Sequence, residues 1–279
     1  MNPGLFLAAK QDSFGGWQTI FRASAVLAAI CACAAFLLLA TDVAHNDLPP
    51  NTLWEVVHAV CVPGQSERHD PEPCLQVDLH GGIESGFAII RDPRGGIQFL
   101  LIPTTRISGI ESPSVRGPHA TNYFADAWEV RRYMNEVLHQ TLPRDYVGLA
   151  INSAVGRSQD QLHIHFSCIR ADVFEALHKN GGNIGHQWAP LNVSFLGHHY
   201  MAMWVAGEQL SPHNPFTLLA EGLPDATRDM GNYTLVVIGF TRAEGTNGFV
   251  ILTDRVNKKN GDLANGEELL DRFCRISAR

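Results

Sequence analysis

The sequence predicts an α+β fold, in which one domain with a mainly antiparallel sheet and packed helices follows a single N-terminal transmembrane helix. Three observations carry this prediction. A 19-residue stretch near the start, Ala23–Thr41, contains no charged side chain. After it, short apolar runs occur in pairs that are separated by turn residues, which is typical of antiparallel hairpins. Between these pairs lie segments whose apolar residues recur at helical spacing.

Composition excludes several classes of protein. The chain has 279 residues and a formal net charge of -7. This length can bury a substantial core, and the balance of residues argues against a collagen-like, low-complexity or disordered chain. The acidic excess lies after residue 41, and no run of lysine or arginine occurs. A nucleic-acid partner is therefore not expected, because such binding depends on neutralising phosphates.

The uncharged stretch predicts a membrane anchor. Its 19 residues would span about 28 Å as a helix, close to the thickness of the hydrocarbon core of a bilayer. Lys10 and Arg22 precede it and Asp42 follows it, an asymmetry that favours a cytoplasmic N-terminus and an exported body. A cleaved signal peptide and a buried core helix are the alternatives. The predicted parts are a short cytoplasmic N-terminus (1–22), the anchor (23–41), a linker (42–50) and the main domain (51–279).

Four of the six cysteines lie outside this anchor. In an oxidising compartment the simplest of their three connectivities joins Cys61 to Cys74, across a loop that contains proline and glycine, and Cys168 to Cys274. Four free thiols are the alternative. No CxxC motif occurs, so a zinc ribbon is not expected.

The first half of the main domain predicts a helix, a hairpin and a second helix. Asp47–Asn51 is expected to be a linker that ends in a helix cap, with a short helix after it through Val60. Gly86–Arg91 and Ile97–Ile102 are apolar runs on either side of the sequence DPRGG, which is a hairpin signal. Apolar residues recur at helical spacing from Asn122 to His139.

The second half predicts more strands. Thr104–His119, with two prolines and a glycine near its end, is expected to be a loop. Two strands should flank a short polar connection, and a short helix and another hairpin should follow. The expected segments are Tyr146–Asn152 and Leu162–Ile169 for the two strands, Asp172–Lys179 for the helix, and Tyr233–Phe240 with Gly248–Thr253 for the hairpin, across Thr246-Asn-Gly248.

Two histidines share one face of the strand predicted at 162–169. Side chains alternate along a strand, so His163 and His165 point to the same side as Gln161, while the apolar residues between them point to the other side. A single histidine would usually be structural or exposed. Two imidazoles on one face, beside a polar loop, indicate a chemical role.

Two chemical roles fit this pair. Both imidazoles could bind one metal ion, with further ligands drawn from histidines that are scattered along the chain: His119, His186, His198, His199 and His213. In the second role, one neutral imidazole attacks phosphorus. The loop before the strand favours the second role, because it supplies hydrogen-bond donors for phosphate oxygens. The candidate donors are Asn152, Gly156, Arg157, Ser158 and Gln159.

The segment GRSQDQLHIHF at 156–166 resembles the His-φ-His-φ-His-φ-φ motif of the histidine-triad (HIT-like) superfamily, where φ is apolar. Within that superfamily, the chain from about residue 50 onwards resembles the bacterial CDP-diacylglycerol diphosphatase family. The supporting runs are LIPTTRISGIESP (101–113), NYF (122–124) with Trp128, AINS (150–153), HIHFSCIR (163–170) with Asp172-Val, Gly197-His198 with Tyr200, and Pro215-Phe216 with LAE (219–221).

This resemblance implies roles for individual residues. His163 corresponds to the middle histidine of the motif, which is the nucleophile, and His165 to the third, which contacts the scissile phosphate or the leaving group. Ser158 corresponds to a hydroxyl residue that bonds the phosphate. Gln161 stands where the first histidine is expected, and it is a candidate phosphate-binding residue, as are Ser158, Asn152, Arg157 and Arg106. The amide of Gln161 can form hydrogen bonds but cannot carry a proton, so we expect the efficiency or pH dependence of the reaction to differ rather than its type.

Two further features allow two interpretations each. Arg106 is either a surface arginine or a contact for the diphosphate or an anionic lipid headgroup. Tyr123, Phe124 and Trp128 either stack on cytosine or, at helical spacing, belong to the core.

The resemblance also implies an activity. A HIT-like domain at 51–279 would hydrolyse CDP-diacylglycerol to CMP and phosphatidate through a cytidylyl-histidine intermediate, without a cofactor or a metal. The protein would be a single-pass protein of the inner membrane, with its catalytic domain on the periplasmic side and its liponucleotide substrate in the lipid bilayer. HIT-like proteins are often dimers, so a homodimer is the oligomeric state to test.

The alternatives are a broader nucleotide-diphosphate hydrolase or CMP transferase, and a non-catalytic exported domain that binds metal. Motifs of several other enzyme classes are absent from the sequence: GxSxG, GxxxxGK[ST], GxGxxG and HExxH.

Overall fold

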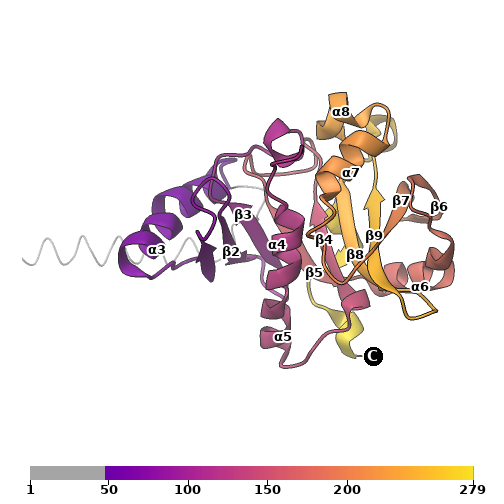
Figure 1. Cartoon of the computed structure of the whole chain (residues 1–279), viewed down its shortest axis with the longest axis horizontal. Coiled ribbons are helices and arrows are strands. Elements are labelled where there is room, and N and C mark those ends of the chain that lie inside the picture. The colour runs from indigo at the N-terminus through magenta and orange to yellow at the C-terminus, as the bar shows by residue number, and fades with distance from the viewer. Residues whose placement is uncertain (1–47, 279) are drawn as a thin grey trace, which may run out of the picture. The chain divides into compact units, whose positions relative to one another are not determined.

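The structure, a computed structural model, describes residues 48–278 (Figure 1). The predicted cytoplasmic segment, the predicted anchor and most of the predicted linker lie outside this range. Across 48–278, none of the helices has both the length and the apolar character that crossing a membrane requires.

Antiparallel pairing organises the fold. Ten strands form one sheet in the order β1-β2-β3-β5-β4-β8-β9-β7-β6, and β10 pairs with β5. This arrangement confirms the predicted α+β class with a mainly antiparallel sheet. The strands are β1 Gln76–Asp78, β2 Phe87–Arg91, β3 Phe99–Pro103, β4 Val147–Ile151, β5 Ile164–Ile169, β6 Ala189–Phe195, β7 His198–Ala206, β8 Leu235–Thr241, β9 Asn247–Thr253 and β10 Leu270–Asp271.

Both predicted hairpins form. Strand β2 pairs with β3, and β8 pairs with β9. The turn of the second hairpin differs from the prediction, because Asn247 and Gly248 already belong to β9. The turn lies at 242–246, where the N–H of Arg242 donates to the carbonyl of Thr246 at 3.0 Å. Gly245 has a φ of 84° there, a left-handed conformation that glycine adopts without steric cost.

Helices pack on the sheet at several places. The α-helices are α2 Thr52–Val56, α3 Val62–Arg68, α4 Tyr123–Val130, α5 Arg132–Leu138, α6 Ala171–Asn180, α7 Pro215–Gly222 and α8 Ala226–Asp229, and a π-helix spans Val57–Cys61. The 3-10 helices are η3 Pro113–Val115, η4 Arg144–Tyr146, η5 Gly181–Asn183, η6 Met230–Asn232, η7 Lys258–Asn260, η8 Gly266–Leu269 and η9 Arg275–Ala278.

Two predicted helices have different bounds in the structure. The first was expected to end at Val60 but continues to Arg68. Its π-helical turn comes just before Pro63, which has no backbone N–H for the helical ladder. The helix expected from Asn122 to His139 is divided into α4 and α5 at Arg131. Asn51, the predicted cap, does precede the first helix but forms no side-chain cap hydrogen bond, whereas the side chain of Asn122 caps α4 by accepting from the N–H of Ala125.

Strand β5 lies in the interior of the sheet between β3 and β4. The residues Leu162, Ile164, Phe166 and Cys168 belong to the main core, which also includes side chains of α4, α5 and α7. The opposite face of β5 carries His163, His165 and Ser167 instead. On the side of the sheet that carries the histidines, α6 contributes to a second core. Figure 1 shows α4 and α6 at separate places on the sheet. The alternation therefore gives one apolar face and one histidine-bearing face.

Two disulfides connect segments of the domain, one over a short and one over a long stretch of sequence. Cys61 is joined to Cys74, and Cys168 is joined to Cys274. The first connects the helical segment before α3 to the segment that leads into β1. The second connects β5 to the C-terminal segment, across a sequence separation of 106 residues.

The two disulfides should stabilise the fold to different extents. Closing a loop of about 100 residues removes more unfolded-state entropy than closing one of about 15, by about 1.5 kcal/mol. All four cysteines are at most 3% exposed, so the cavities left by alanine should be comparable. We therefore expect Cys168→Ala/Cys274→Ala to lower the free energy of unfolding in urea by about 1.5 kcal/mol more than Cys61→Ala/Cys74→Ala. An equal or smaller loss would contradict this expectation.

Candidate active site

His163 lies immediately before β5, and its imidazole is held in one tautomer. Its Nδ1 is 2.7 Å from the backbone oxygen of Gln161. A carbonyl oxygen can only accept, so Nδ1 carries the hydrogen and, in the neutral ring, the lone pair lies on Nε2. The residue is 7% exposed. Nε2 of His163 is therefore the nitrogen that is chemically able to attack an electrophile.

His165 lies deeper, and its ring meets that of His163 edge to face with 4.9 Å between the centroids. The Nε2 of Gln98 lies 3.1 Å from Nδ1 of His165, 2.9 Å from a carboxylate oxygen of Asp92 and 2.8 Å from one of Glu267. Because carboxylates accept, the Gln98 atom that faces Nδ1 of His165 is the amide nitrogen, which cannot accept; its two hydrogens are shared among the three acceptors, and Nδ1 carries no hydrogen. The hydrogen of His165 is then on Nε2, which is 3.4 Å from Glu267 Oε2.

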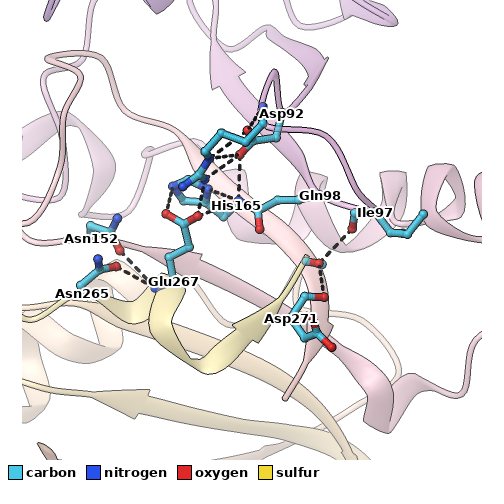
Figure 2. Close-up of polar contacts among 10 residues, drawn as sticks. Asp92, Ile97, Gln98, Asn152, His165, Asn265, Glu267 and Asp271 are labelled. Carbon is cyan, nitrogen blue, oxygen red and sulfur yellow. Dashed lines mark hydrogen bonds and ion pairs between the residues drawn. The ribbon is translucent and has the colours of Figure 1, made fainter. Parts of the chain in front are cut away.

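A buried network of charges surrounds His165 (Figure 2). Arg94 Nη2 donates to Asp92 Oδ2 at 2.7 Å and also to Glu267. Burial raises the pKa of Glu267, but its interactions with His165 and Arg94 and its hydrogen bonds from Gln98 and Arg94 outweigh that effect, and the pKa is about 2. For Asp92, burial likewise raises the pKa, and the contacts with Arg94 bring it below its usual value. Both carboxylates are therefore ionised at neutral pH.

This network also contains three potential metal ligands. Asp92, His165 and Glu267 each present a donor atom, and these atoms lie within 4.8 Å of one another. The guanidinium of Arg94 already pairs with both carboxylates, so it supplies the positive charge that a metal ion would otherwise bring. Between residues 48 and 278, none of the scattered histidines joins His163 and His165 in a group of metal donors.

The side chain of Gln161 has a structural role, because it forms hydrogen bonds to a neighbouring loop. Its Nε2 donates to the carbonyls of Pro103 at 3.1 Å and Thr105 at 2.8 Å, and its Oε1 accepts from the N–H of Ile107 at 3.3 Å. A neutral histidine has one donor and one acceptor and could not form all three bonds. The glutamine therefore fixes the loop at 103–107, and the same loop carries Arg106.

Arg106 is exposed beside the first helix. Its guanidinium donates to the side chain of Asn51 and lies over the ring of Trp54, 5.4 Å from the centroid. Trp54 in turn stacks on His58 with 4.4 Å between the centroids. Sequence reasoning missed this aromatic pair, although Trp54 and His58 are four residues apart, a spacing that places both on one side of a helix.

The other predicted phosphate donors have different positions. Arg157 forms two hydrogen bonds to Glu111, of 2.6 and 2.8 Å. Burial raises the pKa of Glu111, but these bonds lower it below its usual value. Asn152 is buried and its Oδ1 accepts from the backbone N–H of Glu267 at 3.2 Å. Only Ser158 of these three is exposed, so Arg157 and Asn152 hold the site together while Ser158 faces solvent.

The predicted aromatic contacts to a nucleobase are in the core. Tyr123, Phe124 and Trp128 are at most 1% exposed. Phe124 packs on Phe216, and the ring of Trp128 packs against Phe249, with centroids 5.0 and 4.8 Å apart. No ring face of the three is open to a base, so the second interpretation, core packing, accounts for them.

Sequence reasoning also missed the partners of His165. The sequence indicated a role for Gln98 only weakly, since it is a single polar residue next to the apolar run FLLI. Asp92 and Arg94 were assigned to a turn, because DPRGG has the composition of one. Glu267 follows His165 by about a hundred residues, and nothing in the local sequence indicates that the two meet.

Gly266 allows Glu267 to reach this position. A Cβ at Gly266 would lie 2.4 Å from the hydroxyl of Thr234 and 2.8 Å from a methyl carbon of Val236. The segment that carries Glu267 can therefore approach the sheet this closely only because residue 266 has no side chain.

Comparisons with known proteins agree with the resemblance noted in the sequence. A family model described as CDP-diacylglycerol pyrophosphatase matches residues 48–278. A CDP-diacylglycerol pyrophosphatase of Yersinia pestis is 38% identical over 226 residues, which cover 81% of this chain and 84% of that protein. The match to the family model extends over the whole sheet and includes every residue of the site described above.

The ionised Glu267 should make stability depend on pH. Its folded-state pKa is about 2, below the ordinary value, so its contribution is present above about pH 4.5 and is lost as the pH falls towards 2. We expect Glu267→Gln to lower the free energy of unfolding at pH 7 by about 3 kcal/mol, and the difference from wild type to shrink between pH 5 and pH 2. Glu244→Gln, at an exposed site, serves as the control. A difference that stays constant with pH would contradict this account.

Proposed function

Since this chain belongs to the CDP-diacylglycerol pyrophosphatase family, we propose that it hydrolyses the diphosphate bond of CDP-diacylglycerol and releases CMP and phosphatidate. The single observation that carries the proposal is the hydrogen bond from Nδ1 of His163 to the backbone oxygen of Gln161. It leaves the lone pair of the neutral ring on Nε2, as a nucleophilic imidazole requires. The other side chains of the site support this reactivity.

The first step forms a covalent intermediate. Nε2 of His163 attacks the phosphorus that bears cytidine, a P–N bond forms, and the P–O bond to phosphatidate breaks with its electron pair on the departing oxygen. The ring then carries a positive charge, and the Nδ1–H bond to Gln161 becomes charge-assisted and therefore stronger. Phosphatidate is a good leaving group, so this step needs no strong general acid.

The second step restores the enzyme. Water attacks the cytidylyl phosphorus, a P–O bond forms, and the P–N bond breaks with its electron pair returning to Nε2 of His163. The proton that water loses goes to solvent, and CMP is released. Positioning and charge stabilisation carry both steps, so we propose that no cofactor is required.

His165 fits a positioning role best. Its Nδ1 accepts from Gln98 and its Nε2 faces Glu267, while the edge-to-face contact of the rings supports His163. For Nε2 of His165 to contact the scissile phosphate or the leaving group, as the HIT-like resemblance implies, it would have to exchange Glu267 for the substrate. The 3.4 Å separation from Glu267 Oε2 is longer than an ordinary hydrogen bond. Little free energy is therefore lost when the substrate replaces Glu267 as the partner of Nε2.

Arg106 and Ser158 are the proposed contacts for phosphate oxygens. Both side chains are exposed, and Gln161 holds the backbone on either side of Arg106 while its own carbonyl binds His163. Local donors are needed, because a protein with a net charge of -7 does not attract an anionic liponucleotide by its overall field.

The substrate class suggests where the enzyme works. We propose that the predicted anchor at 23–41, which lies outside the described residues, keeps the catalytic domain at the inner membrane and on its periplasmic side. The two disulfides support an oxidising compartment. A homodimer is the oligomeric state we propose to test, by light scattering of the purified protein.

Replacing the nucleophile should abolish turnover. We expect His163→Ala to reduce hydrolysis of CDP-diacylglycerol by about three orders of magnitude or more, measured as CMP and phosphatidate by mass spectrometry. His119→Ala, at an exposed histidine outside the site, should keep wild-type activity. The melting temperatures of both variants should match that of wild type. If folded His163→Ala retained a tenth of the activity, the assignment of the nucleophile would be wrong.

Removing the exposed guanidinium should weaken substrate binding. A charge-assisted hydrogen bond contributes about 1.5–3 kcal/mol, so we expect Arg106→Ala to raise the KM for CDP-diacylglycerol by about tenfold or more. Arg106→Lys should recover part of the loss, and Arg132→Ala, an exposed arginine on α5, should leave KM unchanged. An unaltered KM in Arg106→Ala would remove Arg106 from the binding site.

A further inference from the structure

A second cluster of ionisable side chains lies where β7 and β9 meet the segment that follows them. His198 begins β7, Asp254 directly follows β9, and Asp262 lies further along the chain. One ring nitrogen of His198 and one oxygen of each aspartate lie within 4.8 Å of one another. Nδ1 of His198 is 3.8 Å from Asp262 Oδ1. These residues line a cavity of about 340 Å³, and we call them the His198 cluster.

Negative charge at the His198 cluster is not balanced. A third carboxylate, Glu268, lies 2.7 Å from Nδ1 of His198 and accepts from the hydroxyl of Tyr200 at 2.8 Å. In the described part of the chain, His198 is the only basic side chain that forms an ion pair with Asp262 or Glu268, and Asp254 has no ion pair. Three carboxyl groups thus share one imidazole, and burial together with the hydrogen bond to Asp262 raises the pKa of Asp254 to about 7.

The neighbouring arginines are used elsewhere. Arg255 pairs with Asp229 at 2.6 Å, and Arg170 pairs with Asp172 at 2.7 Å. Neither guanidinium therefore offsets the excess negative charge of the His198 cluster. Buried carboxylates without a compensating charge are costly.

An unsatisfied oxygen points to a missing ligand. Asp254 is 7% exposed; its Oδ1 accepts from the backbone N–H of Arg255 at 2.6 Å. Its Oδ2 is fully buried and accepts from no N–H or O–H donor among residues 48–278, and the carboxyl groups of Asp254 and Asp262 can bond to each other only while they share a proton. Buried carboxylate oxygens are nearly always satisfied, and an exception often marks the place of an ion or a water. Here the exception occurs in a residue that lines the same cavity as two other potential ligands, His198 and Asp262.

We propose that the His198 cluster binds one divalent cation through Nδ1 of His198 and the carboxylates of Asp254 and Asp262, with Glu268 close enough to complete the site. A mixed set of imidazole and carboxylate ligands suits Zn²⁺ or Mn²⁺ better than Mg²⁺ or Ca²⁺, which take oxygen ligands. Binding requires the lone pair on Nδ1, so the hydrogen moves to Nε2 or, from a protonated ring, is released.

The cation would have a structural role. It would tie the start of β7 to the segment at 254–268, which also carries Glu267 to His165. Glu267 and Glu268 are adjacent, so one points to the buried network of the active site and the other to the His198 cluster. The proposed site therefore stabilises the fold and supports the active site from outside, and it takes no part in bond breaking.

The test measures metal content and thermal stability in the full-length, tag-free protein. After treatment with a chelator, the protein is dialysed against Zn²⁺ or Mn²⁺, and bound metal is measured by elemental analysis. We expect about one ion per chain and, at a free metal concentration a hundredfold above the Kd, a rise in the melting temperature of about 5–10 °C. His165→Ala should give the same ratio, which separates this site from the group Asp92, His165 and Glu267 in the active site.

Two variants and a control locate the site. Asp254→Asn should weaken binding by at least tenfold and remove the rise in melting temperature, and Asp225→Asn, at an exposed aspartate, should change neither. His198→Ala, at a partly exposed position that tolerates truncation, should reproduce the loss if Asp254→Asn does not fold. Wild type that retains no metal after dialysis, or metal binding that is unchanged in the folded variants, would overturn the proposal.

Discussion

The hydrogen bond between Nδ1 of His163 and the backbone oxygen of Gln161 is the interaction on which the site depends. It decides which imidazole nitrogen carries the hydrogen and which keeps its lone pair. The carbonyl can do this only if the backbone of Gln161 is itself fixed. The side chain of Gln161 provides that constraint through three hydrogen bonds to the loop at 103–107, and the sheet provides it on the other side, since β5 is paired along both edges.

This arrangement requires a network of charged side chains to be buried. Placing Asp92, Arg94 and Glu267 behind His165 requires removing their charges from water, which is unfavourable unless each charge is paired and hydrogen-bonded. The depressed pKa of Glu267 shows that pairing outweighs burial. The network orients His165 through Gln98 and Glu267, and Asn152 and Gly266 hold Glu267 in place.

Local patterns were sufficient for much of the fold. The hairpins and the alternation of β5 follow from the order of nearby side chains, and the structure has both. The region from 189 to 206 was not predicted. Strand β6 is an edge strand with several exposed positions, and β7 begins with two histidines rather than with apolar residues, so neither has a clear alternating pattern. Strand β6 pairs only with β7, and β7 joins the rest of the sheet through β9, which is distant in sequence.

The candidate site, like the fold, was predicted only in part. The sequence located the histidines, because strand alternation places them on one face, but it assigned Arg157 and Asn152 to a ligand when both bond to protein groups. The bonds of Arg157 to Glu111 and of Asn152 to Glu267 join residues that are far apart in the chain. Tertiary packing determines these hydrogen-bond partners, and neither the composition nor the spacing of residues in the sequence indicates them.

The central claim is that Nε2 of His163 becomes covalently bonded to phosphorus during turnover. The most direct measurement is to mix the full-length enzyme with CDP-diacylglycerol, quench within milliseconds under alkaline conditions, and map the modified peptide by mass spectrometry. The account predicts a cytidylyl group on His163, at a level that rises before CMP does and then declines. A phosphatidyl group on His163, a cytidylyl group on another residue, or CMP formation with no enzyme adduct at any time would contradict it.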